Sequence, residues 1–122
     1  MTSISPTLNI NTSNIGLTGH SMGGTGTWQI ALSYPDKFSA VAPLSGSVKL
    51  TNKNISKLKN TPVWAIVGNE DTIVSPSTSI NFINELKTSN SNAKITILDG
   101  YDHFEVPNAY LETDVINWLI TQ

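Results

Sequence analysis

Three residues of the kinds used in nucleophilic catalysis each follow a predicted strand: Ser21, Asp71 and His103. Ser21 lies between Gly19 and Gly23 in the pattern G-x-S-x-G. This pattern is typical of a sharp turn from a strand into a helix, with the serine hydroxyl pointing outward. A serine hydroxyl is a poor nucleophile until a base takes its proton. The pattern alone also fits a turn rich in glycine and serine without chemistry, so its partners decide the interpretation.

A base and an acid for this serine are present further along the chain. Imidazole titrates near neutral pH, so His103 can take the proton, and Asp71 can hold the other ring nitrogen. His20 is the alternative base, but side chains of successive residues diverge, which favours a packing or pocket role for it. Glu70 and Asp102 are alternative acids, and each also fits a solvated loop carboxylate.

The segment around Ser21 offers further groups to a substrate. The N–H of Met22 lies at a predicted helix N-terminus, where unpaired N–H groups and a partial positive charge can stabilise an oxyanion. His20, Tyr101 and Phe104 are candidate substrate-binding residues beside the predicted site, although burial alone explains the two aromatic residues equally well. The three tryptophans lie within apolar segments, which favours the core over a sugar-binding surface.

The glycines beside Ser21 have a predicted steric role. A side chain at Gly19 or Gly23 is expected to press on the neighbouring strand or helix, and glycine avoids this contact. Gly24 is expected to let the new helix lie close to the sheet.

The positions of apolar residues and of turn residues predict the elements that carry these side chains. Strands are expected at residues 15–19, 38–44, 62–67 and 93–98. Helices are expected at residues 22–33, 76–88 and 106–121, with a weak helical turn at residues 55–58. The last helix is expected to point Tyr110, Leu111, Val115, Trp118 and Leu119 inward.

Strands that alternate with helices predict an α/β fold with a mainly parallel sheet of about four strands and flanking helices. Ligands of such sheets gather at the carboxyl ends of the strands. Ser21, Asp71 and His103 all fall at such ends, so we expect them to converge there.

Composition limits the function further. The 122 residues suffice for one domain, expected at residues 15–122 after a loosely ordered lead-in at residues 1–14. The net charge is −2 and arginine is absent, which argues against nucleic-acid binding. Neither a signal peptide nor a membrane span is evident, which leaves the compartment open with the cytoplasm favoured. No cofactor motif or metal-ligand spacing is evident either.

Three stretches resemble esterase-type α/β-hydrolases, near the dienelactone-hydrolase-like and the feruloyl- or polyhydroxybutyrate-esterase-like groups. IGLTGHSMGGTGTWQIALSYPDKFSAVAPLSG resembles their nucleophile region, PVWAIVGNEDTIVSP their acid loop and GYDHF their histidine loop. The resemblance covers residues 15–122. It implies a carboxylesterase that cleaves small esters through an acyl-serine, with Ser21 as nucleophile, Asp71 as acid, His103 as base and Met22 as oxyanion donor.

The resemblance also implies a truncated fold, because members of these groups carry further strands before the serine. Their serine-bearing strand is central, whereas here it is expected at an edge, with Ile15 and Leu17 exposed. We therefore predict a homo-oligomer that pairs through the edge near residues 15–18. The alternative is a split or truncated hydrolase with little activity that needs a complementary chain.

Overall fold

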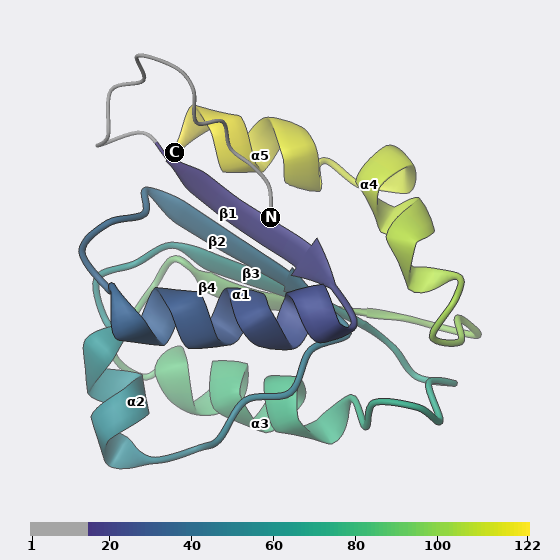
Figure 1. Ribbon diagram of the computed structural model, residues 1–122, viewed down its shortest axis with the longest axis horizontal. Helices are drawn as coiled ribbons and strands as arrows, with labels where there is room; N and C mark the ends of the chain where they lie inside the picture. Colours follow the sequence, from purple (N-terminus) through teal and green to yellow (C-terminus); the bar gives the residue numbers. More distant parts are fainter. Residues whose placement is uncertain (1–14) are drawn as a thin grey trace.

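A computed structural model describes residues 15–122 of the chain (Figure 1). The predicted lead-in at residues 1–14 lies outside the described residues. The elements in order are β1 (Gly16–His20), α1 (Met22–Ser33), β2 (Ala40–Leu44), α2 (Asn52–Lys57), β3 (Val63–Gly68), α3 (Ser77–Leu86), β4 (Ala93–Leu98), the 3-10 turn η2 (Val106–Asn108), α4 (Ala109–Glu112) and α5 (Val115–Thr121).

The strands form one parallel sheet in the order β1-β2-β3-β4, which confirms the predicted four-stranded fold. The predicted bounds of α1 and β4 agree with the structure, and β1 and β3 each begin and end one residue later than expected. β2 begins only at Ala40, because the chain from Phe38 to Ser39 is still leaving the turn after α1.

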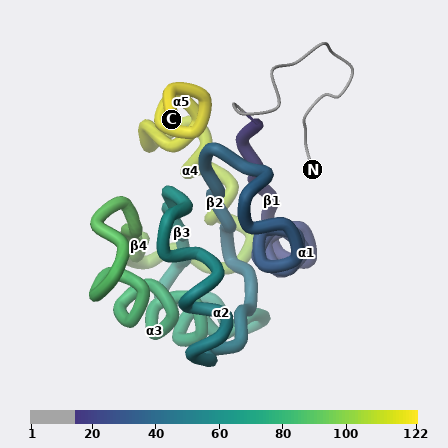
Figure 2. Tube along the Cα trace, turned by 90° about the vertical axis from the view of Figure 1, so that its left-hand side faces the viewer, coloured from purple at the N-terminus to yellow at the C-terminus, as the bar shows by residue number. Residues whose placement is uncertain are grey.

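Helices cover both faces of the sheet (Figure 1). Figure 2 shows α1, α2 and α3 on one side of the strands and α4 and α5 on the other. Both faces of β2 and β3 are thereby covered, and every residue of these two strands is buried. Such burial explains the uninterrupted apolar runs that identified these strands in the sequence.

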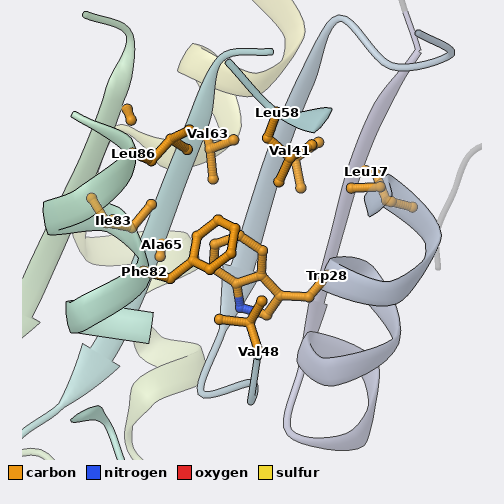
Figure 3. Packing of buried hydrophobic residues seen from close by; sticks show 12 residues of the cluster. Leu17, Trp28, Val41, Val48, Leu58, Val63, Ala65, Phe82, Ile83 and Leu86 are labelled. Carbon is orange, nitrogen blue, oxygen red and sulfur yellow. The ribbon is translucent and has the colours of Figure 1, made fainter. Parts of the chain in front are cut away.

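The larger apolar cluster lies under α1 and α3 and is centred on Trp28 and Phe82 (Figure 3). Their rings are 5.0 Å apart and tilted, and both side chains are fully buried. The indole N–H of Trp28 donates to Ser79 Oγ, and that hydroxyl donates to the Gly46 carbonyl. This buried chain of hydrogen bonds joins both helices to the loop after β2, and so fixes the helix that begins at the serine turn.

On the opposite face of the sheet, the prediction of one long last helix is wrong. The chain forms three short segments there, η2, α4 and α5. Thr113 is extended where α4 ends, and its hydroxyl accepts the Val115 N–H as α5 begins. The helical period is therefore interrupted between the two segments. Leu111, expected inward, is 89% exposed, whereas Val115 and Leu119 are buried as expected.

β1 lies at the edge of the sheet, and within residues 15–122 it pairs with β2 alone. The edge position of this strand was predicted, but the predicted exposure of Leu17 is wrong. Leu17 is buried because it faces the side of the sheet that α1 covers, where it joins the cluster of Trp28 and Val41. Ile15 is half-buried. The predicted homo-oligomer stays a prediction. Among residues 15–122, no helix is long and apolar enough to cross a membrane.

Candidate active site

Ser21 occupies a strained turn between β1 and α1. Its φ of 64° and ψ of −118° are unfavourable for a residue with a side chain, at a cost of about 1–3 kcal/mol. The Ser21 N–H donates to the Leu44 carbonyl, and the Ser21 carbonyl accepts the N–H of Thr25 in the first turn of α1. Backbone hydrogen bonds on both sides therefore hold the serine at the end of the sheet.

The glycines around this turn are not equivalent. A Cβ at Gly19 would lie 2.5 Å from the Gly23 carbonyl oxygen, and one at Gly24 would overlap the Leu44 carbonyl. These two positions require glycine for the expected steric reason. The expectation is wrong for Gly23, where a Cβ would meet nothing within 4 Å, because this position faces away from the sheet.

The structure brings Ser21, His103 and Asp71 into one hydrogen-bonded chain. His103 Nε2 lies 2.7 Å from Ser21 Oγ, and His103 Nδ1 lies 2.8 Å from Asp71 Oδ2. Ionised carboxylates only accept hydrogen bonds, so Nδ1 carries the proton toward Asp71 and Nε2 is left to accept from the serine hydroxyl. The arrangement therefore presents a base to a hydroxyl, as in a serine nucleophile with its orienting acid.

Asp71 is held in the ionised form that this arrangement needs. Burial opposes its charge, but the N–H groups of Val74 and Ile73 and the ring of His103 outweigh burial and lower the pKa of the carboxyl. The two N–H groups bind Oδ1, while Oδ2 faces His103. The short turn after β3 thus orients the carboxylate as well as stabilising it.

Side chains tie the histidine loop to its neighbours. Asn69 donates to Asp99 and accepts the Gly100 N–H, which joins the acid loop to the chain after β4. On the other side, His20 Nε2 lies 2.9 Å from the carbonyl oxygen of His103. Its ring centroid is 4.8 Å from that of His103. His20 lies beside the base and does not replace it, because His103 is the histidine that contacts Ser21.

Met22 begins α1, so its N–H has no acceptor within the helix and stays available beside Ser21. The helix dipole adds a partial positive charge at the same place. The Met22 side chain itself is 88% exposed. The role of the Met22 N–H as an oxyanion donor stays a prediction.

An open cavity of about 370 Å³ adjoins the serine. Its lining is Ser21, Met22, Thr25, Gly26, Gln29, Ile73 and Val74. The last five of these residues were not predicted from the sequence. Two signals were available. The positions in α1 recur every three to four residues from the serine, on one helix face. Ile73 and Val74 come two and three residues after Asp71.

The predicted substrate-binding residues do not line this cavity. Tyr101 packs against the apolar cluster under α4 and α5, which includes Ile66 and Val115, and its hydroxyl donates to Glu112. Phe104 is 75% exposed with its ring edge-on to His103, so it lies beside the base rather than in the cavity.

The alternative acids point elsewhere. Asp102 accepts the N–H groups of Phe104 and Glu105 and so stabilises its own turn. Glu70 is exposed. Within residues 15–122, no three metal-ligating side chains gather where they could hold an ion.

The parallel sheet, the serine turn and the Ser21-His103-Asp71 chain are those of an α/β-hydrolase. The family model described as the dienelactone hydrolase family matches residues 3–111, and the chain belongs to this family.

Cutinases are among its relatives. Cutinase 2 of Thermobifida cellulosilytica is 36% identical over 117 residues, covering 90% of this chain and 41% of that protein. Cutinase cut1 of Thermobifida fusca is 36% identical over 117 residues, covering 90% of this chain and 34% of that protein. The chain thus spans 34% to 41% of the length of these relatives.

Two solved structures share the fold. A thermostable esterase superposes with a TM-score of 0.84 at 26% identity, covering 93% of this chain and 32% of that one. SOBER1 of Arabidopsis thaliana superposes with a TM-score of 0.72 at 27% identity, covering 93% of this chain and 54% of that one.

Proposed function

We propose that the site hydrolyses small carboxylic esters through an acyl-serine intermediate. The observation that carries this proposal is the chain from Ser21 Oγ through the His103 ring to Asp71, with distances of 2.7 and 2.8 Å. The serine lies at the wall of an open cavity, where an ester carbonyl can approach it. The cutinase and esterase names of the relatives agree with this reaction class.

The proposed reaction has two halves. His103 Nε2 takes the proton of Ser21 as the hydroxyl oxygen attacks the ester carbonyl, and returns that proton to the departing alcohol. Water then attacks the acyl-serine as His103 Nε2 takes one of its protons. The bond from the acyl carbon to Ser21 Oγ breaks, Oγ receives that proton from His103, and the acid is released. Asp71 stays ionised throughout and stabilises the imidazolium, which its lowered pKa favours.

The lining of the cavity bears on the charge of the acyl group that it can bind. Ile73, Val74 and the helix face from Met22 to Gln29 give it a mainly apolar wall without a lysine. No positive side chain is therefore available there to bind a charged acyl group, so we infer that neutral esters are preferred.

The rate depends on how many N–H groups meet the oxyanion. Within residues 15–122 we assign one donor, the Met22 N–H, and loss of a single donor from an oxyanion hole costs about 10²- to 10³-fold in kcat. We infer that this chain by itself turns over slowly. A complementary segment, from a second copy or another chain, is expected to supply a second donor and accelerate the reaction.

Hydrolysis of p-nitrophenyl acetate by the wild-type chain and the Ser21→Ala variant tests the proposal. We expect the variant to lose the catalysed rate, and labelling by a fluorophosphonate probe should likewise depend on Ser21. Equal rates in both proteins would contradict the role of Ser21. Esterase activity without labelling of Ser21 would point to another nucleophile.

Light scattering after size-exclusion chromatography tests the predicted homo-oligomer. We expect a stable dimer or larger assembly, because the outer edge of β1 offers unpaired backbone groups among the described residues. A stable, well-folded monomer would contradict this prediction and favour the hypothesis that a different chain completes the site.

A further inference from the structure

His20, the residue before Ser21, contacts the main chain of His103, whose ring faces Ser21. His20 is the last residue of β1, and its Nε2 lies 2.9 Å from the His103 carbonyl oxygen. A carbonyl can only accept, so Nε2 carries the proton and donates it. Neighbours in the sequence thus hold one residue at two points: Ser21 contacts the ring of His103, and His20 contacts its backbone.

We propose that His20 is a positioning residue that keeps His103 in place when its contact with Ser21 is lost. Of the hydrogen bonds found within residues 15–122, two join the loop of residues 99–105 to β1 and the serine turn. The one through Ser21 Oγ ends when the acyl group forms, because the ester oxygen then has no proton to donate. The one through His20 takes no part in the reaction and persists.

This inference rests on the proposed function, because only an acyl-serine removes the serine proton. Deacylation then needs His103 to receive a water proton from an unchanged position. A misplacement of about 1 Å can cost about 100-fold in rate. The tether at His20 limits such movement during the half of the reaction in which the loop has lost its other contact with β1.

Burial favours the neutral form that this role needs. It lowers the pKa of His20 below its ordinary value of 6.5, although the hydrogen bond to the His103 carbonyl raises it. The nearby His103 lowers the pKa further. A neutral His20 with the proton on Nε2 donates to the carbonyl without placing a second positive charge beside the imidazolium that forms in the reaction.

Two variants of His20 separate the donor from the ring. His20→Phe keeps a planar ring against His103 but removes the donor. His20→Gln removes the ring but places an amide N–H₂ near the position of Nε2. We expect His20→Phe to slow deacylation and lower kcat by about 10- to 100-fold, with KM falling in step and kcat/KM little changed. His20→Gln should recover most of the loss in kcat.

Three outcomes would overturn the inference. An unchanged kcat in His20→Phe would show that the tether is dispensable. A rise in KM alone would show that His20 contacts the substrate. An equal loss in His20→Phe and His20→Gln would show that the donor is not the cause. If His20→Phe does not fold, as judged by circular dichroism, His20→Leu takes its place.

A second readout does not depend on turnover. The proton between His103 Nδ1 and Asp71 should give a downfield NMR signal. In the Ser21→Ala background, where the contact of His103 with Ser21 Oγ is absent, we expect this signal to broaden with His20→Phe and to remain sharp with His20→Gln. An unchanged signal in both variants would overturn the inference. If the wild-type chain shows no hydrolysis dependent on Ser21, the proposed function fails and this signal still decides whether His20 positions His103.

Discussion

The serine turn and the histidine loop hold their side chains by different means. Ser21 is fixed by backbone hydrogen bonds and by the absence of a Cβ at Gly19, all within a few residues and the neighbouring strand. His103 is fixed by side chains from other elements, including Asp71 on its ring and His20 on its carbonyl. Steric constraint is rigid and local, whereas a single hydrogen bond contributes only about 1 kcal/mol.

The comparison predicts where substitutions harm activity and where they harm stability. Changes at the serine turn should act through steric overlap and cost folding free energy. Changes at the histidine loop should misorient His103 and should therefore lower the catalytic rate more than they lower the free energy of unfolding.

The largest expected effect is on rate, in Asp71→Asn. Asparagine can keep its Oδ1 on the Ile73 and Val74 N–H groups, which turns its amide N–H₂ toward His103 Nδ1. The ring must then accept there and carry its proton on Nε2, where it cannot act as base. We expect kcat for p-nitrophenyl acetate to fall by about 10⁴-fold while the chain stays folded. A rate within tenfold of wild type would exclude Asp71 as the orienting acid, where tenfold corresponds to about 1.4 kcal/mol.

Gly19→Ala should have the largest effect on stability. Its Cβ would meet the backbone of Gly23 at 2.5 Å, and backbone atoms cannot move aside cheaply. We expect a loss of about 2–3 kcal/mol in the free energy of unfolding, measured in urea. Gly23→Ala is the matched control, because its Cβ meets open space and its stability should change by less than about 1 kcal/mol. Equal losses in the two variants would contradict the steric account of the turn.

Acidification should remove the stability that Asp71 contributes. Its folded pKa lies below the ordinary value of 3.8, so the unfolded chain binds the proton more tightly than the folded protein. The contribution is complete above the unfolded pKa and is lost as the pH falls through the folded pKa. The free energies of unfolding in urea of the wild type and of Asp71→Asn should therefore differ by a constant amount at neutral pH. This difference should become smaller below about pH 4. If this difference in unfolding free energy grew on acidification, the pKa of Asp71 would be raised on folding, contrary to the prediction.

The smallest effect is expected where two loops are tied at the surface. Asn69→Ala removes the hydrogen bonds to Asp99 and to the Gly100 N–H, whereas Asp99→Ala removes only the first. Since both residues are exposed, we expect losses of about 1 kcal/mol or less, with Asn69→Ala the more costly. A double-mutant cycle of unfolding free energies measures the coupling between the two side chains. The absence of any coupling would show that the tie does not operate in solution.

The sequence predicted the elements best where local rules decide them. Glycine spacing located the serine turn, and uninterrupted apolar runs located β2 and β3, because both patterns depend on neighbours in the chain. The last helix was predicted wrongly, since the Thr113 side chain competes for backbone hydrogen bonds in a way that apolar periodicity does not register. The burial of Leu17 was also not predicted. It depends on the position of α1, which packs over this residue and is not specified by the sequence of β1 alone.

The sequence by itself determined which residues could do chemistry, because residue types and the order of strands bring Ser21, Asp71 and His103 to one end of a parallel sheet. Only the tertiary structure decided which side chains hold them there. The contacts of His20 with His103 and of Asn69 with Asp99 join residues 83 and 30 positions apart in the chain. Such pairings depend on how the loops pack, and no pattern within a single segment specifies that packing.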